Sequence, residues 1–514
     1  MSATTEPRAR RRRRPRPEGG GGARQVDYRT LRNPFPPVPA FSEDAVAEMH
    51  ATALRVLEEL GMKILLPEAR ALFRAAGARV DDASEMVWIG REIVEAALAT
   101  APKRFTLRAG AKARDIVLEL GRLAIQPGAG APHATDLKRG RRPGRLEDFR
   151  ELLMLTQHFD ALHMLPPLVE PQDIPPHERH YAMTEAELTL SDKVPFVFSR
   201  GAGQVTDCFE MIAGARGVGA EAFGKDPWCY TIVNTNSPRQ IDIPMAMGLI
   251  DFARAGQMTI VTPFCLMGAM APATVAGALT LSHAEALAAI TLAQIAGPGA
   301  PVCYGAFASN VDMKSGAPAF GTPEQVQANL GAGQLARLVG LPWRSAAGCA
   351  ANINDAQAAH ETQMSAWGAI LGGATVLLHG AGWIEGGLTV SYEKLITDME
   401  MIQTFAELCT PPAEDAGAIA FEALQEVPPG GHFFGASHTM ERYQAAFYEP
   451  LVADWSNFGT WSERGALTAS ERATGIWEGI LRDFTPPDAL GERRDWLNGF
   501  IAKRRAEGGA APES

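Results

Sequence analysis

The sequence lacks paired cysteines, long apolar runs and the usual metal-binding motifs. Its six cysteines are scattered along the chain and contain no Cys-x-x-Cys pair. This spacing argues against a disulfide framework or a thiolate metal site, and it suits a reducing cytoplasm. No run of about 18 apolar residues occurs, so we expect no membrane span. The N-terminus also lacks the apolar segment of a secretory signal, which favours a cytoplasmic location.

Histidine and glycine motifs are also missing. The eleven histidines form no His-Glu-x-x-His or related zinc motif. His432 and His438 are six residues apart in a glycine-rich stretch, where hydrogen bonds that stabilise a loop are a better interpretation than a metal pair. The glycines between Gly380 and Gly387 match neither G-x-x-x-x-G-K-[ST] nor G-x-G-x-x-G, which argues against a phosphate cradle. We therefore predict no bound metal.

Positive charge is concentrated at the N-terminus. The formal net charge is −11, yet residues 1–25 contain eight arginines against two glutamates, which leaves about −17 for the rest of the chain. This tail could be interpreted as a nucleic-acid arm. Its proline and glycine content and its lack of apolar residues instead predict a disordered segment over residues 1–33. Because the acidic body would repel phosphate, we expect no nucleic-acid partner.

The remaining sequence is dominated by a regular alternation of apolar runs and helical stretches. The runs expected as strands are His163–Leu165, Val194–Phe198, Trp228–Val233, Met258–Val261, Val302–Tyr304, Trp343–Ala347 and Ala374–Leu378. The helices expected between them are Pro176–Ser191, Pro238–Ala255, Pro272–Ile295, Pro323–Val339 and Ala356–Leu371. Strand-to-strand spacings of about 30 to 43 residues are typical of βα units.

Seven or eight such units predict an α/β fold, a (β/α)8 TIM barrel, with an open doubly wound sheet as the alternative. For the uncertain eighth strand, Gly431–Phe434 is one candidate. We expect the barrel over residues 146–485, preceded by an N-terminal helical and small-β cap region over residues 34–145. A C-terminal helix and tail are expected over residues 486–514.

The cap region has its own local signals. Ser42 is a good N-cap for a first helix, and two shorter helices are expected over Pro67–Ala76 and Gly90–Thr100. Short strands are expected over Phe105–Leu107, Ile116–Leu118 and Leu123–Ile125.

The most informative segment runs from Gly348 to Glu361. It follows an apolar run and enters an alanine-rich helix, so its small residues lie at the carboxyl end of a predicted strand. In α/β folds that edge is where ligands bind. The polar residues that project from the loop or the first helical turn are Asn352, Asp355, Gln357 and Glu361. The acids also have a structural interpretation, since an acid at a helix N-terminus complements the helix dipole.

Polar and aromatic residues follow other predicted strands as well. They are Asn234, Asn236, Phe264, Tyr304, Phe307, His379, Trp383 and Glu385. Aromatic faces together with a carboxylate suit a trialkyl- or quaternary ammonium group, through cation–π attraction and a counter-charge. Packing or capping explains any single one of these residues more readily. Their joint placement at successive strand ends gives the two interpretations equal weight.

The segment from Gly348 to Glu361 closely resembles the active-site stretch of the trimethylamine methyltransferase family, whose members pass a methyl group from a methylated amine to a corrinoid cofactor. Other stretches over about residues 40–480 resemble this family in the same order and spacing. They are Gln126–Gly128 with His133 and Asp136, Pro263–Leu281 with His283–Glu285, Gly297–Gly305, Asp312–Gly316, Gly382–Glu393 and Gly430–Glu441.

This resemblance implies a (β/α)8 barrel, a homo-oligomer, and a separate corrinoid protein as the methyl acceptor. The chain contains no Asp-x-His-x-x-Gly corrinoid-binding motif, so the corrinoid is expected on that partner. In pyrrolysine-containing members, the pyrrolysine falls three residues before the Asp of the Asp-x-Gln-Ala motif. The residue at that position here is Asn352.

The asparagine shapes the functional hypothesis. The resemblance implies that pyrrolysine forms an adduct with, or orients, a neutral methylamine, and asparagine has no electrophilic imine for that role. A quaternary ammonium does not need such help, because its N-methyl carbon is already electrophilic and a neutral tertiary amine leaves. We therefore expect a quaternary amine such as glycine betaine as the methyl donor.

The hypothesis assigns a role to each candidate residue. The catalytic set is Asn352 at the pocket floor, with Asp355 and Glu385 facing the cation. Phe264, Tyr304, Phe307 and Trp383 wall the pocket, and the other substrate-binding candidates are Glu361, Gln357, His379, Asn234 and Asn236, the last four as donors to a betaine carboxylate. Two alternatives stay open: a trimethylamine methyltransferase that works without pyrrolysine, and a non-catalytic binding protein for quaternary amines.

Overall fold

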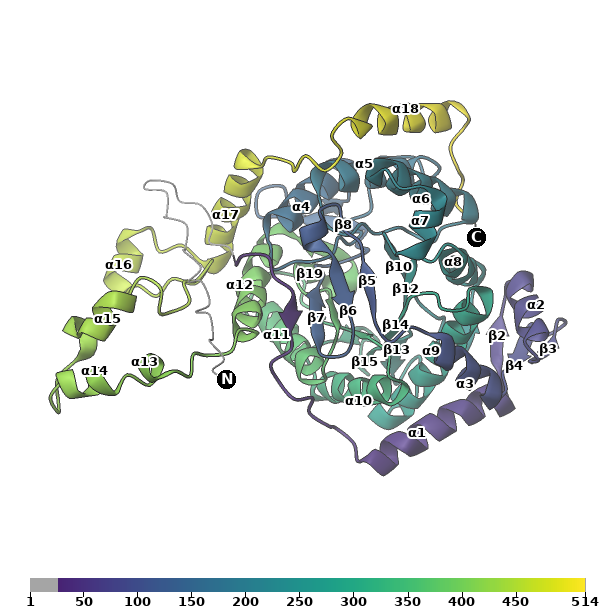
Figure 1. The fold of residues 1–514 in the computed structure, drawn as a ribbon, viewed down its shortest axis with the longest axis horizontal. Coiled ribbons are helices and arrows are strands. Elements are labelled where there is room, and N and C mark those ends of the chain that lie inside the picture. The colour runs from purple at the N-terminus through teal and green to yellow at the C-terminus, as the bar shows by residue number, and fades with distance from the viewer. Residues whose placement is uncertain (1–25, 514) are drawn as a thin grey trace, which may run out of the picture.

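The computed structural model describes residues 26–513, which adopt an α/β fold (Figure 1). The main sheet has the strand order β1-β7-β18-β17-β14-β12-β10. These strands are β1 (Leu31–Arg32), β7 (Arg122–Ile125), β10 (Tyr230–Val233), β12 (Met258–Val261), β14 (Val302–Gly305), β17 (Trp343–Ala346) and β18 (Val376–Leu378). All neighbours pair in parallel except β1 and β7, which are antiparallel. The arginine-rich residues 1–25 lie outside the described residues.

Two short segments connect β7 to β10 through backbone contacts. Parallel bridges join Met164 to Val194 and Phe196 to β10. The amide of His163 donates to the carbonyl of Ile125, in β7, at 2.8 Å. The runs His163–Leu165 and Val194–Phe198, which the sequence predicts as strands, therefore form only isolated bridges, and one backbone hydrogen bond connects the first of them to β7. Because β7 also pairs with β18, it takes part in the main sheet, although its residues lie in the range expected for the cap region.

The helices that surround these strands follow the predicted alternation (Figure 1). They are α4 (Leu146–His158), α5 (Arg179–Leu190), α6 (Ala202–Arg216), α7 (Ala220–Lys225), α8 (Ile243–Arg254), α9 (Val275–Ala296), α10 (Pro323–Val339), α11 (Ala356–Leu371) and α12 (Tyr392–Leu408). Helix α10 has proline in its first turn, and its N-cap Thr322 accepts from the amide of Gln325 at 3.2 Å. Figure 1 shows helices around the outside of the strands.

Helix α9 is long and apolar enough to cross a membrane by length and composition alone, which the sequence analysis does not anticipate. However, 72% of its apolar window is buried inside the protein. It packs against α8 and against the N-terminal helices α1 (Glu43–Arg55) and α3 (Arg91–Thr100), and it carries the buried His283 and Glu285. These contacts are those of a core helix. Protein covers several sides of α9, whereas a membrane-spanning helix exposes an apolar side to lipid.

The N-terminal region begins as the sequence predicts and then adds an unpredicted sheet. Ser42 is the N-cap of α1 and accepts from the amide of Ala45 at 3.3 Å. Helix α2 (Pro67–Ala75) precedes β3 (Arg79–Asp81), which pairs with β4 (Met86–Trp88). Strand β4 also pairs with β2 (Met62–Ile64), and β2 pairs with β11 (Gln240–Ile241) from the main body. A separate hairpin joins β5 (Phe105–Leu107) and β6 (Ile116–Leu118).

Neighbouring residues of the main strands belong to two different buried clusters. Val261, Tyr304 and Leu377 pack in the large cluster that includes the surrounding helices. Cys303 and Leu378, each one residue away, pack in a second cluster with side chains from the other strands. Since successive side chains of a strand point to opposite faces, the second cluster lies on the face away from the helices. We call it the inner cluster.

Residues 410–467 form an arm that projects from the rest of the protein (Figure 1). It contains the short helices α13 (Ala416–Ile419), α14 (Phe421–Glu426), α15 (Ser437–Arg442) and α16 (Phe458–Glu463). The suggestion that Gly431–Phe434 is a strand is wrong, because this segment leads into the single helical turn Phe433–Gly435 and pairs with no strand among the described residues. After the arm, α17 (Ala469–Asp483) packs on α12, and α18 (Arg493–Ala506) is the C-terminal helix.

His163 connects three parts of the chain and should make stability depend on pH. Its Nδ1 accepts from the amide of Ile125, and its Nε2 lies 3.2 Å from the carbonyl of Arg29 and donates to it. Burial lowers the pKa of this neutral imidazole to about 4. A proton on Nδ1 would face the Ile125 N–H, so the folded state resists protonation.

We expect the protein to lose stability as the pH falls from about 6.5 to about 4. In that window the unfolded chain binds a proton that folded His163 does not, so the free energy of unfolding decreases as pH decreases, by about 3 kcal/mol for this residue at the lower end. Urea unfolding at pH 7.5 and pH 5 measures the loss. His163→Gln should show a shallower dependence, and an unchanged slope would contradict this role.

Candidate active site

Five ring-bearing side chains form an aromatic cluster where the main strands end. Phe264 begins β13 (Phe264–Met267), Phe307 begins β15 (Phe307–Val311), and Trp383 begins β19 (Trp383–Ile384). The ring centroids of Phe264 and Phe307 are 5.0 Å apart, and those of Phe320 and Trp383 are 5.3 Å apart. The His379 ring stacks on Trp383 at 4.7 Å. The structure therefore brings together four predicted residues, and adds Phe320.

The loop that carries Asn352 is held by Glu361. One carboxylate oxygen of Glu361 accepts from the amides of Ala350 and Ala351 at 2.6 and 3.0 Å. The other accepts from the side-chain amide of Gln357 at 2.7 Å. Glu361 is thus buried and positions the loop, while the side chain of Asn352 is exposed.

The same loop is joined by its backbone to Glu385. The amide of Glu385 donates to the carbonyl of Ala351, and that of Gly386 to the carbonyl of Cys349, both at 2.9 Å. Asp355 is the N-cap of α11 and accepts from the amide of Ala358 at 3.1 Å, with an exposed side chain. Cys349 is buried, and burial raises the pKa of its thiol to about 12. The Asn352 loop and Glu385 therefore form one unit.

Glu385 is partly open to solvent and is paired with an arginine that the sequence analysis does not identify. Its side chain is 13% exposed. The Nε of Arg141 donates to both carboxylate oxygens, at 3.1 and 3.0 Å, and Nη2 of the same arginine lies 3.3 Å from Nδ1 of His133. Glu385 has a φ of 54°, a left-handed conformation that costs energy for a residue with a Cβ.

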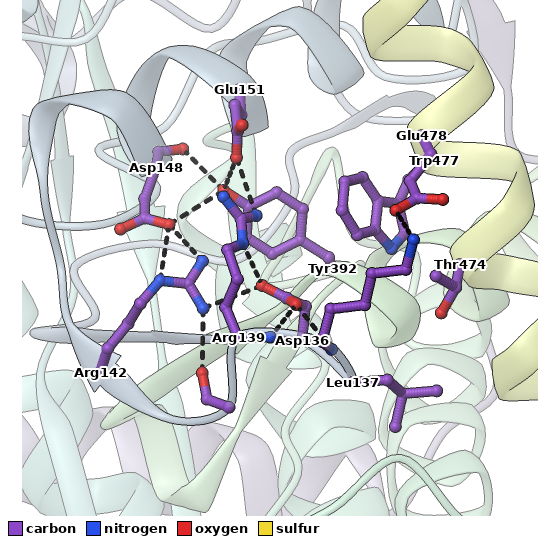
Figure 2. Close-up of polar contacts among 12 residues, drawn as sticks. Asp136, Leu137, Arg139, Arg142, Asp148, Glu151, Tyr392, Thr474, Trp477 and Glu478 are labelled. Carbon is purple, nitrogen blue, oxygen red and sulfur yellow. Dashed lines mark hydrogen bonds and ion pairs between the residues drawn. The ribbon is translucent and has the colours of Figure 1, made fainter.

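The hairpin that carries Arg141 is fixed by a buried charge network (Figure 2). Strands β8 (His133–Thr135) and β9 (Arg142–Pro143) flank it, and its fully buried Asp136 carboxylate accepts from Arg139 at 2.7 Å and Arg142 at 2.8 Å. Asp148 in α4 accepts from Arg142 at 3.1 Å through Nε. Figure 2 shows these groups converging beside Tyr392.

Helices α4 and α12 complete this network. Arg139 donates to Glu151 at 2.9 Å, and the Tyr392 hydroxyl donates to the same carboxylate at 2.6 Å. Burial of Asp136 would raise its pKa, but the amide and guanidinium of Arg139 outweigh burial and hold the pKa below its usual value. The network therefore fixes the hairpin on both sides of Arg141 through buried ion pairs.

The most unusual residue near the aromatic cluster is Arg344, which the sequence analysis also misses. It lies in β17, is 2% exposed, and its guanidinium carbon is 5.0 Å from the centroid of Phe307. Its Nη2 is 3.2 Å from Nε2 of His379, while its Nε and Nη1 have no hydrogen-bond partner within residues 26–513. An arginine inside the run WRSAA, otherwise a typical buried strand, is the signal that could have revealed it.

Three predicted residues lie apart from the aromatic cluster. Tyr304 faces the helices, and its hydroxyl is 3.0 Å from Nδ1 of His283 in α9. Asn236 braces the start of α8, because its amide nitrogen donates to Asp242 at 3.0 Å and its oxygen accepts from the Asp242 amide at 3.0 Å. Asn234 is exposed after β10. Within residues 26–513, no three His, Cys, Asp or Glu side chains gather as a metal site.

Comparisons with known proteins identify the family. The family model described as trimethylamine methyltransferase (MTTB) matches residues 8–509. The chain is 34% identical to the glycine betaine methyltransferase of Desulfitobacterium hafniense strain Y51, over 91% of this chain and 97% of that protein. It is 29% identical to the trimethylamine methyltransferase MttB of Desulfitobacterium hafniense strain DSM 10664 / DCB-2, over 92% and 95% of the two chains.

One solved structure, the monomethylamine methyltransferase MtmB of Methanosarcina barkeri, is similar over 86% of this chain and 93% of that one, with 11% identity and a TM-score of 0.45. The sequence comparisons alone decide the classification, since the family model covers nearly the whole chain. The chain therefore belongs to the trimethylamine methyltransferase family.

Proposed function

We propose that this protein transfers a methyl group from a quaternary amine such as glycine betaine to the Co(I) corrinoid of a partner protein. The observation that carries the proposal is Asn352, on a loop beside the aromatic cluster, at the position where the family resemblance implies pyrrolysine in pyrrolysine-containing members. The 34% identity to a glycine betaine methyltransferase over 97% of its length supports the same substrate class.

The reaction needs positioning more than acid–base chemistry. The Co(I) nucleophile supplies the electron pair of the new Co–C bond, the C–N bond breaks, and its pair stays on the nitrogen, which leaves as a neutral tertiary amine. The donor loses its positive charge as this happens. Aromatic faces of Phe264, Phe307 and Trp383 stabilise the cation by cation–π attraction while excluding water. The exposed Asn352 side chain borders the approach of the acceptor.

The proposal also covers the closed barrel and the cellular location. The parallel pairing from β10 to β7, together with the isolated bridges and the one backbone hydrogen bond that lead from β10 back to β7, supports a closed (β/α)8 barrel with the inner cluster as its interior. The corrinoid then approaches the carboxyl ends of the strands on its own protein. A cytoplasmic location suits this partnership, because the scattered thiols fit a reducing compartment.

The arm supports a homo-oligomer. Phe434, Phe447 and Phe458 are 83%, 85% and 78% exposed, and Phe421 and Trp455 are also exposed. An apolar surface of this kind is typical of a permanent interface, whereas a corrinoid partner that comes and goes at each turnover needs a smaller and more polar one. We therefore assign the arm to contacts with a second copy of the chain.

Methylation of free Co(I) cobalamin tests the function. With glycine betaine as donor, we expect the visible spectrum to change from that of Co(I) to that of methylcobalamin, and we expect no such change with trimethylamine. Turnover of trimethylamine would instead support a methyltransferase that works without pyrrolysine. Binding of betaine with no methylation of either cobalamin or a corrinoid protein would support a non-catalytic binding protein and contradict the proposal.

A further inference from the structure

We propose that Arg344 binds a carboxylate of the methyl donor, so that the enzyme selects zwitterionic quaternary amines over simple ammonium cations. This inference rests on the proposed methyl transfer and adds the residue that would determine its specificity. Around the aromatic cluster, the buried polar atoms that have no hydrogen-bond partner within residues 26–513 are mainly N–H groups. Such a set is complementary to an anion.

The guanidinium of Arg344 is the first part of this set. It is 2% exposed and yet no carboxylate among the described residues pairs with it, and Nε and Nη1 have no hydrogen-bond partner. Leaving a charge buried and unpaired destabilises a protein by several kcal/mol. Nη2 has a second N–H besides the one that faces His379, and together with Nε or with Nη1 it forms the planar fork that matches the two oxygens of a carboxylate.

His379, which contacts Arg344, provides a second donor that has no partner among residues 26–513. Arginine has no acceptor, so Nε2 of His379 must accept from Nη2 of Arg344, at 3.2 Å. The neutral imidazole then carries its proton on Nδ1, which is buried and has no partner. Burial and the charge of Arg344 lower the pKa of His379 well below its usual value, so this tautomer is maintained at neutral pH. Its φ of 55° is a strained conformation of the kind found at functional sites.

Trp383 adds a third donor and links the set to the aromatic faces. Its ring stacks on His379 at 4.7 Å, and its indole N–H is buried and has no partner. The Arg344 guanidinium lies over Phe307, whose ring is 5.0 Å from that of Phe264. An anion bound by the donors would therefore lie beside rings that suit an ammonium group. A betaine joins these two charges through a short chain, whereas choline or tetramethylammonium would bring a second cation to an unpaired arginine.

The test compares glycine betaine with its methyl ester, which keeps the ammonium group and lacks the carboxylate. For the wild-type protein we expect affinity for betaine to exceed that for the ester by about 100-fold or more, the usual range for truncating one partner of a buried charge pair. Arg344→Met should weaken betaine binding by a similar factor and leave ester binding nearly unchanged. Quenching of tryptophan fluorescence on titration measures binding without any need for methyl transfer.

Controls distinguish this role from a structural one. Arg344→Met should keep or raise the unfolding midpoint, because it removes an unpaired buried charge, while a structural arginine would lower it. The matched control is Arg337→Met on α10, a half-buried arginine that donates to the Gly372 carbonyl and should leave betaine selectivity intact.

The outcomes separate the two proposals. If the wild-type protein methylates cobalamin from betaine but Arg344→Met binds betaine and its ester as the wild type does, the role of Arg344 is excluded and the methyl transfer stands. If the wild-type protein selects betaine through Arg344 but transfers no methyl group to any corrinoid, the transfer is excluded and the carboxylate site stands. Equal affinity of the wild-type protein for betaine and its ester also overturns the inference.

Discussion

Replacing Asp136 with alanine is expected to lower the free energy of unfolding by about 3 kcal/mol, since it removes the buried acceptor that two arginines share and leaves each arginine with one acid partner. Asp136 is the acid that both Arg139 and Arg142 share, and its carboxylate is fully buried (Figure 2). Without it, two guanidinium groups face each other beside Tyr392. Urea unfolding at pH 7.5 measures the effect.

The same substitution should also weaken the donor site. Arg141 lies between Arg139 and Arg142 on the hairpin and pairs with Glu385, so loosening the hairpin frees Glu385 from its ion pair. We expect Asp136→Ala to raise the KM for the methyl donor. Asp136→Asn keeps a hydrogen-bond acceptor and should lose less stability than Asp136→Ala. Glu210→Ala, an exposed acid on α6, is the matched control and should change neither property. Wild-type stability for Asp136→Ala would contradict the anchoring role.

Triple replacement of Phe434, Phe447 and Phe458 with serine is expected to convert an oligomer to single chains. These side chains are each more than three-quarters exposed on the arm, and burying one phenylalanine contributes about 1.5–3 kcal/mol. The combined loss of several kcal/mol per interface changes the dissociation constant by three orders of magnitude or more. Sedimentation velocity over a concentration series measures the mass.

The control for the arm replaces apolar residues that are exposed elsewhere. Leu60→Ser with Leu338→Ser removes exposed apolar side chains from the body and should leave the mass unchanged. A monomeric wild-type protein would exclude the homo-oligomer. If the triple variant then methylated free cobalamin normally but failed with a corrinoid protein, the arm would be the docking site for that partner.

The strands and helices of the main body are well predicted because their apolar runs and helical stretches are long and regular. Met258–Val261 is found as predicted, and α11 begins and ends where the sequence indicates. The short strands β13, β15 and β19 are not predicted. They follow directly after main strands, so their residues look like loops, and their pairing depends on contacts between distant segments.

The candidate site is only partly predictable, for a different reason. Main strands that are buried on both faces have mostly apolar residues on both faces, so the sequence does not reveal which side chains face the helices. Tyr304 and Cys303 illustrate this: the aromatic residue faces α9, and the thiol faces the inner cluster. Arg344 stands out in the sequence as an arginine inside a buried strand, but the lack of a partner for Nε and Nη1 among residues 26–513 is visible only in the structure.

The burial of the thiols has a consequence for the chemistry of a methyl donor. A thiolate is a strong nucleophile toward an electrophilic methyl carbon, and Cys349 is three residues from Asn352. Burial raises the pKa of Cys349 to about 12, and it also raises the pKa of Cys303. Both therefore remain protonated at neutral pH. Protonated thiols are weak nucleophiles, so neither side chain competes strongly with an external acceptor for the methyl group.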